Sequence, residues 1–263
     1  MTTRIGIAGD WHGSKEWALA RVEDFHDAQI LTILHLGDFG IWHDEEGQDY
    51  LFSLNALLES FGMKIRVTLG NHENYVMVSA LVTITEGDDA GWQFSPELPN
   101  ILYATRGLRW EWEGVSFVSL GGANSIDRFG RVEGMNWWAE EQIGYGDIMR
   151  TTMGGHAEIM VTHDCPEGVP LFGSHRTSDD EWSIEAMAYG SHSRDDLRVA
   201  VDVVKPELLF HGHYHHYLDL NTELVDAEGE SYMLHTIGLD KDGEANNIGI
   251  LELPSKKFTI LDY

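Results

Sequence analysis

Residues 4–13 read RIGIAGDWHG, an apolar run that ends in Asp10 and His12. Such a short run, rich in apolar residues, is typical of a β-strand buried on both faces. Four later segments repeat the arrangement at residues 30–36, 64–69, 158–161 and 207–210. The motifs that follow these runs are Gly37-Asp38, Gly70-Asn71-His72-Glu73, Thr162-His163-Asp164 and Gly212-His213-Tyr214-His215. One such motif alone would be weak evidence of a functional site, but five of them in order are hard to obtain by accident.

The stretches between these runs predict how the strands are connected. Helical spacing of apolar residues predicts helices over 15–29, with Ser14 as N-cap, and over 48–61, closed by Gly62. A third helix is predicted over 193–204, beginning at Ser193. Strands joined by such crossovers are most simply parallel, so the polar residues at their carboxyl ends should meet at one edge of a sheet. From Trp110 onward, short β-rich runs that include 248–253 and 257–263 predict a second, mixed sheet.

These elements predict an α/β fold, a four-layer α-β-β-α sandwich of two mixed sheets flanked by helices. A chain of 263 residues can bury one large core, and no linker, repeat or low-complexity tract divides it. A single domain over 1–263 is therefore expected. The first ten residues enter a strand without an apolar leader, and no run approaches the roughly 18 apolar residues of a membrane span. We therefore expect a cytoplasmic enzyme without membrane contact, in the host cytoplasm if a phage encodes it.

The residue types in the motifs indicate a metal centre. Asp, Asn and neutral His suit Mn, Fe, Zn or Ni better than Ca. Two such ions, roughly 3.5–4 Å apart, could clamp a phosphate and lower the pKa of a shared water to about neutrality. This chemistry hydrolyses phosphoesters.

The ordered pattern D-x-H, G-D, G-N-H-[DE], H, G-H-x-H resembles that of the calcineurin-like metallophosphoesterase superfamily, from Asp10 to His215. The resemblance implies two divalent ions, with Mn expected first and Zn, Fe, Ni or Mg as alternatives, and attack by a metal-bridging hydroxide. It implies that one ion is held by Asp10, His12, Asp38 and His215. It implies that the other is held by Asp38, Asn71, His163 and His213. By the same resemblance, His72 is the catalytic histidine that contacts the scissile phosphate and assists the leaving group, while Asn71 also lies against substrate.

A narrower resemblance covers residues 99–104, 109–112 and 121–127, with Arg131 and Trp137-Trp138 beyond them. These segments are similar to a bacterial and phage phosphodiesterase branch, and they imply activity on 2′,3′-cyclic nucleotides. The chain departs from the protein-phosphatase pattern G-D-x-x-D-R-G, because Ile41 and Trp42 occupy the Asp and Arg positions. A serine/threonine protein phosphatase is therefore not expected.

The charge balance restricts the substrate. The chain has 44 acidic residues against 17 Lys and Arg, a formal charge of −27. Proteins that bind long polynucleotides need Lys or Arg to replace phosphate counterions. A small phosphoester or nucleotide is therefore the expected partner, and long DNA or RNA is not.

Several other residues permit two interpretations. Arg128 and Arg131 could each bind a phosphate oxygen, or pair at the surface with Glu133 or Glu140. The paired Trp137 and Trp138 are expected to pack in the core. The sole cysteine, Cys165, allows no intrachain disulfide, and a Cys-x5-Arg phosphatase loop is excluded because its Arg position is Leu171. His35 and His211 are expected in the core, whereas His43, His175 and His216 are expected in loops near the site.

The sequence thus predicts a phosphodiesterase acting on small or cyclic nucleotides. A phosphomonoesterase or nucleotide pyrophosphohydrolase of the same fold would keep every motif and stays an alternative. A nuclease is less favoured because the chain carries a large negative charge. A non-catalytic scaffold is less favoured because such a protein should have lost metal ligands, and this sequence keeps all seven. The oligomeric state stays open.

Overall fold

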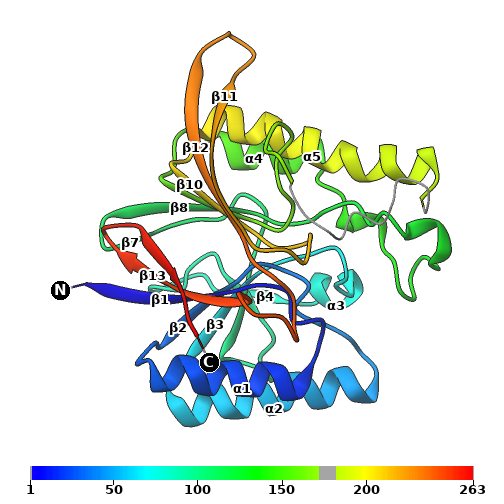
Figure 1. Ribbon diagram of the computed structural model, residues 1–263. Helices are drawn as coiled ribbons and strands as arrows, with labels where there is room; N and C mark the ends of the chain where they lie inside the picture. The colour runs from blue at the N-terminus through cyan, green and yellow to red at the C-terminus, as the bar shows by residue number, and fades with distance from the viewer. Residues whose placement is uncertain (1, 172–181, 263) are drawn as a thin grey trace.

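The computed structural model describes residues 2–171 and 182–262, which form two packed sheets with helices on both outer faces (Figure 1). The first sheet has the order β14-β13-β1-β2-β3-β6-β5-β4. Its strands are β1 (Thr3–Ala8), β2 (Thr32–His35), β3 (Lys64–Thr68), β4 (Val82–Thr83), β5 (Gln93–Phe94), β6 (Ile101–Ala104), β13 (Ile248–Leu253) and β14 (Lys257–Ile260). Strands β1, β2, β3 and β6 are parallel to their neighbours in this series, and β13 pairs antiparallel with β1.

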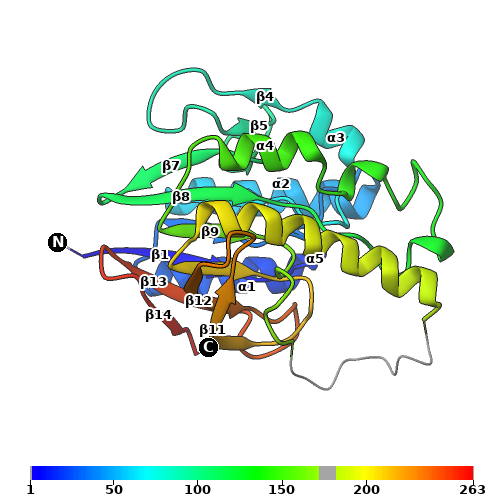
Figure 2. The same ribbon diagram turned by 90° about the horizontal axis from the view of Figure 1, so that it is seen from above.

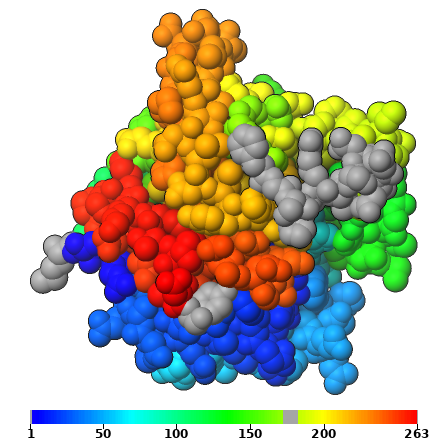
Figure 3. Space-filling model, in the orientation of Figure 1, coloured from blue at the N-terminus to red at the C-terminus, as the bar shows by residue number. Residues whose placement is uncertain are grey.

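The second sheet has the order β11-β12-β10-β9-β8-β7. Its strands are β7 (Arg109–Trp112), β8 (Val115–Leu120), β9 (Ile159–Thr162), β10 (Leu208–His211), β11 (Leu218–Val225) and β12 (Ser231–Gly238). The four strands β8, β9, β10 and β12 are parallel, and β7 and β11 pair antiparallel at the two edges. Figure 3 shows the hairpin of β11 and β12 projecting from the body of the molecule.

Within the described part of the chain, five α-helices complete the layers. They are α1 (Lys15–Asp27), α2 (Glu45–Phe61), α3 (Tyr75–Ser79), α4 (Tyr145–Thr152) and α5 (Ile184–Val204), with short 3₁₀ turns at Arg128–Gly130 and Ala139–Glu141. Helices α1 and α2 cover the outer face of the first sheet, while α4 and α5 lie side by side over the second (Figures 1 and 2). Among the described residues, no helix is both long and apolar enough to cross a lipid bilayer.

Buried apolar side chains of residues 2–171 and 182–262 form three clusters, which fill the three spaces between the four layers. Alternation along β2 separates two of them: Ile33 packs toward α1 and α2, and Leu34 packs between the sheets. Leu209 of β10 faces the third cluster, together with Leu197 of α5. The predicted four-layer sandwich is therefore confirmed, and the buried strands follow from apolar runs that face a core on both sides.

Three details differ from the expectations. Helix α5 begins at Ile184, so Ser193 is a buried mid-helix residue and the N-cap is Ser183, whose hydroxyl accepts from the Ala186 N–H at 3.1 Å. The sequence did not predict this earlier start because the residues around Gly190 are weak helix formers. Strands β13 and β14 return to the first sheet instead of extending the second. The five motif strands are divided between the sheets, so their polar ends meet across two sheet edges, not along one.

Candidate metal centre

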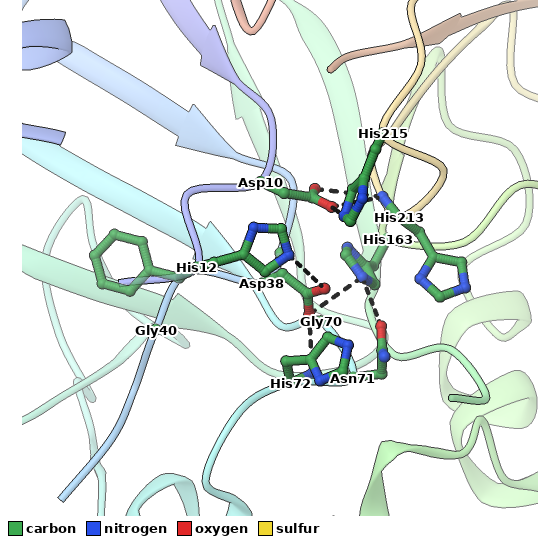
Figure 4. A network of polar contacts seen from close by, with 12 residues as sticks. Asp10, His12, Asp38, Gly40, Gly70, Asn71, His72, His163, His213 and His215 are labelled. Carbon is green, nitrogen blue, oxygen red and sulfur yellow. Dashed lines mark hydrogen bonds and ion pairs between the residues drawn. The ribbon is translucent and has the colours of Figure 1, made fainter. Parts of the chain in front are cut away.

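The five motifs converge where β1, β2 and β3 of the first sheet end opposite β9 and β10 of the second (Figure 4). Their side chains form two groups of His and Asp in which the possible ligand atoms all lie within 4.8 Å of one another. The first group contains Asp10, His12, Asp38 and His215, and the second contains Asp38, His163 and His213. Asp38 belongs to both groups.

The two carboxylate oxygens of Asp38 face different histidines. Oδ2 lies 3.5 Å from Nε2 of His12, and Oδ1 lies 3.3 Å from Nε2 of His163. In the first group, Nε2 of His215 is 3.3 Å from Oδ2 of Asp10. Next to the second group, Oδ1 of Asn71 lies 2.9 Å from Nε2 of His163. The structure therefore places six of the seven residues that the resemblance implied as ligands in these two groups, with Asn71 beside the second group through its contact with His163. Their role as ligands stays a prediction.

Unusual backbone conformations aim these side chains. His12, Asp38, His213 and His215 all have positive φ, between 45° and 68°. Non-glycine residues rarely adopt this region, and each such residue costs on the order of 1–3 kcal/mol. Favourable packing of the surrounding residues must offset this cost, and backbone strain of this kind is concentrated at functional sites.

Glycine at two motif positions allows the loops to approach one another. A Cβ on Gly37, whose φ is +103°, would lie 2.4 Å from Nδ1 of His163. A Cβ on Gly212 would lie 2.0 Å from Oδ1 of Asp10. Any side chain at either position would displace a residue of the cluster.

The buried carboxylates draw positive charge toward the centre. Burial opposes ionisation of Asp38, but His163 and His72 outweigh it, and the pKa of Asp38 lies well below its usual value. Burial also disfavours charge on His12 and His163, yet the pKa of each ring is raised to about 10. For His12 the main cause of the rise is its hydrogen bonds to Asp242 and Asp38. For His163 the main cause is the charge of Asp38. The buried carboxylates thus favour positive charge at this position.

The donor set fits divalent metal ions. It consists of carboxylate, amide and imidazole groups without thiolate, which suits first-row divalent metals. Burial lowers the pKa of His213 to about 4, so its ring is neutral and able to ligate. Cys165 lies in neither group, is fully buried, and has its pKa raised by that burial.

Two carboxylates that sequence reasoning did not select support the cluster. Oδ1 of Asp242 lies 2.9 Å from Nδ1 of His12, so it fixes the ring that presents Nε2 to Asp38. Glu73 is buried and accepts hydrogen bonds from the backbone N–H groups of Phe39, Gly40, Ile41 and Gly70. No sequence signal identified Asp242, whereas Glu73 stood inside the third motif without an assigned role.

His72 lies beside the cluster but in neither group. Its backbone N–H donates to Oδ1 of Asp38 at 2.8 Å, and its ring centroid is 6.2 Å from that of His12. Its Nε2 lies 3.5 Å from Nη2 of Arg131. Burial lowers the pKa of His72. The ring is therefore placed next to the centre with a cation on its far side.

Arg131 and Arg128 have different surroundings in the structure. Arg131 lines a cavity of about 350 Å³ together with His12 and His72, and Asp127 holds its guanidinium through bonds of 2.7 and 2.6 Å. Its carboxylate partner is therefore Asp127 and not Glu133 or Glu140. Arg128 stacks over the rings of Tyr189 and Trp137, at 4.3 and 4.7 Å. It lines neither this cavity nor the larger one described below.

The remaining residues take the places expected of them where the structure describes them. Trp137 and Trp138 are buried, as are His35 and His211. The Gly37 N–H donates to Nδ1 of His35 at 3.3 Å, and burial lowers the pKa of His35 to about 3. His43 and His216 line the two cavities at the edge of the centre, whereas His175 lies outside the described residues.

Comparison with known proteins gives a family and a fold. The family model described as calcineurin-like phosphoesterase matches residues 3–217. A dimetal phosphatase from Danio rerio is 13% identical with a TM-score of 0.53, covering 94% of this chain and 91% of that chain. A protein from Thermus thermophilus is 11% identical with a TM-score of 0.49, covering 98% of both chains. An archaeal phosphodiesterase is 13% identical with a TM-score of 0.41, also covering 98% of both. No curated protein matches significantly, and structural likeness at these identities shows only the fold.

Proposed function

The chain belongs to the calcineurin-like phosphoesterase family, and on that premise we propose that it is a phosphodiesterase of small or cyclic nucleotides, 2′,3′-cyclic ones included. The family places it among metal-dependent hydrolases of phosphoesters. The observation that carries the narrower proposal is a pair of cavities that meet at the metal centre, with His72 in the wall of both.

The protein's own ligands would hold two divalent cations, with manganese proposed first. Asp10, His12, Asp38 and His215 would hold one, and Asp38, Asn71, His163 and His213 the other. When bound, such a pair neutralises phosphate oxygens and supplies a hydroxide nucleophile near neutral pH. In this proposal His72 would assist the leaving oxygen, and Arg131 would stabilise charge on the phosphoryl group.

The two cavities suit a phosphorus atom that carries two ester groups. The smaller, of about 350 Å³, opens beside His12, His72 and Arg131. The larger, of about 890 Å³, opens beside Asp38, Asn71 and His213. A monoester has one organic substituent and needs one of these spaces, whereas a diester with two separate organic groups fills both. A 2′,3′-cyclic nucleotide carries both ester oxygens on one ribose, so its single nucleoside needs only one of the two spaces.

The smaller cavity has both aromatic and polar side chains in its walls. Trp42 and Trp138 line it together with His43 and Asn74. Trp42 also donates from Nε1 to the carbonyl oxygen of His72 at 2.9 Å, so this ring positions the histidine as well. Aromatic faces stack nucleobases, and the neighbouring polar groups can bond their edges.

The charge of the chain limits how large the substrate can be. At a formal −27, the protein repels a polyanion far more than a diester with a single charge. Small diesters therefore reach the centre more readily than long DNA or RNA. The phosphomonoesterase and the nucleotide pyrophosphohydrolase remain the alternatives within the family.

The proposal is tested by initial rates at matched salt and saturating Mn²⁺. Bis(p-nitrophenyl) phosphate and a 2′,3′-cyclic nucleotide should be cleaved faster than p-nitrophenyl phosphate, and duplex DNA hardly at all. A monoester rate at least tenfold above the diester rates would replace the proposal with a phosphomonoesterase. Efficient degradation of DNA would overturn the charge argument.

A pair of variants tests the role of the smaller cavity. Met135 lines this cavity and is 70% exposed, whereas Met153 is 81% exposed and lines neither cavity. Met135→Trp should slow bis(p-nitrophenyl) phosphate by more than it slows p-nitrophenyl phosphate, because it fills the space for one of the two separate ester groups. Met153→Trp, the matched control, should leave both rates within about twofold. Equal slowing of monoester and diester by Met135→Trp would contradict the assignment.

A further inference from the structure

A buried chain of hydrogen bonds runs from Glu141 through Ser125 to Asn71. The Ser125 hydroxyl donates to Oε2 of Glu141 at 2.5 Å, and Nδ2 of Asn71 donates to Oγ of Ser125 at 2.9 Å. All three side chains are at most 2% exposed. Glu141 belongs to neither group of candidate ligands, and these hydrogen bonds link it to the centre through Ser125 and Asn71.

The donors around Glu141 fix the direction of every hydrogen in this chain. Its Oε1 accepts from the Ser125 N–H and from the Tyr189 hydroxyl, both at 2.9 Å. Burial raises the pKa of Glu141, and the donors from Ser125 and Tyr189 oppose this rise by stabilising the ionised form, which can only accept. The single hydroxyl proton of Ser125 is therefore committed to Glu141, and its oxygen is left to accept from Asn71.

This direction determines which end of the Asn71 amide faces the centre. With Nδ2 bonded to Ser125, Oδ1 lies toward Nε2 of His163 at 2.9 Å. Only the amide oxygen can ligate a cation, since the NH₂ group has no free lone pair to offer. An amide flipped by 180° would present two hydrogens to the metal position and leave the serine oxygen without a donor.

We propose that Glu141 and Ser125 are positioning residues that hold the Asn71 amide with its oxygen toward the second metal position. The proposal rests on the dinuclear centre of the proposed function. Glu141 ends a 3₁₀ turn, and Tyr189 comes from α5, whose backbone also accepts from Asn124 at 2.7 Å. The region between β8 and α4, together with α5, thus sets the orientation of a ligand that follows β3.

Calorimetric titration of the metal-free protein with Mn²⁺ tests this role without any activity measurement. The wild type should bind two ions. Ser125→Ala should weaken one of them about 10–100-fold, the usual effect of losing such a supporting bond, and leave the other within about threefold. Glu141→Gln should do the same, because its NH₂ group would donate to the serine and turn the hydroxyl proton toward Asn71.

Two further variants separate orientation from general damage to the fold. Ser119→Ala removes another buried hydroxyl, which contacts Thr68 at 3.1 Å and not Asn71, and should leave both affinities within about threefold. In an Asn71→Asp background an oxygen faces the metal position either way, so adding Ser125→Ala should change neither affinity by more than about threefold. Thermal unfolding of each metal-free variant records any loss of fold.

The outcomes distinguish this proposal from the one on which it rests. Wild-type protein that binds two ions, with Ser125→Ala unchanged, would overturn the positioning role alone. A loss of equal size in the Asn71→Asp background would overturn it as well, because orientation would not then be the cause. Wild-type protein that binds fewer than two ions would overturn both proposals.

Discussion

The carboxylate of Glu73 joins the loop that carries Asp38 to the loop that carries Asn71. Its Oε1 accepts from the N–H groups of Phe39 at 2.8 Å and Gly70 at 3.4 Å. Its Oε2 accepts from those of Gly40 at 3.3 Å and Ile41 at 3.1 Å. These bonds hold the turn in which Asp38 has a φ of 48°. Removing an acceptor here should therefore affect both stability and the metal centre.

The magnitude follows from the number of bonds that a conservative change removes. In Glu73→Gln one oxygen survives, while an NH₂ group faces two backbone N–H groups in a fully buried position. Each buried donor left unpaired costs about 1–3 kcal/mol, which gives about 2–6 kcal/mol in total. Typical domains unfold with about 5–15 kcal/mol, so the variant should fold but with much reduced stability.

Urea unfolding of the metal-free protein measures this loss, because EDTA removes any stabilisation by bound ions. The control is Glu207→Gln, whose carboxylate pairs with Lys256 at the surface and is 57% exposed, and it should change stability by less than about 0.5 kcal/mol. Manganese affinity should fall at both positions in Glu73→Gln. An unfolding free energy within about 0.5 kcal/mol of wild type would refute the reasoning.

Three further changes test the neighbours of the centre. His72→Ala should keep about two metals per chain and lose about 10²–10⁴ in rate on a cyclic nucleotide, with a smaller loss for a p-nitrophenolate leaving group; loss of metal instead would make His72 a ligand. Asp242→Ala should weaken Mn²⁺ binding about 10–100-fold by freeing the His12 ring, and unchanged titration curves would exclude that support. Cys165→Ala should keep the rate within about threefold, and the native thiol should resist labelling because it is fully buried; a hundredfold loss of rate would point to a chemical role.

The clustering of the candidate ligand residues was predictable because each is adjacent to a strong local signal. A short apolar run followed by Asp38 or His163 shows where a strand ends, and strand ends of this fold class lie together. The division of these strands between two sheets was not predictable, since an apolar run does not say which sheet it joins. For the same reason, β13 was expected in the second sheet and pairs instead with β1.

The supporting residues escaped prediction because they are distant in sequence and ordinary in type. Asp242 bonds His12 across 230 residues, and Glu141 acts on Asn71 only through Ser125. Nothing local distinguishes either acid from the many others in this chain. The positive φ of His12 and Asp38 is likewise set by tertiary packing, because His and Asp tolerate this region better than most residues but do not prefer it.

The metal content of Asp38→Ala, measured by elemental analysis beside the turnover of a diester, tests the central claim most directly. Asp38 is the carboxylate common to both ligand groups, with one oxygen near His12 and the other near His163. Its loss should empty or disorder both positions and abolish hydrolysis, whereas Asp49→Ala at the surface should leave both unchanged. Near-normal metal content and rate in Asp38→Ala would contradict a dinuclear centre built around this residue.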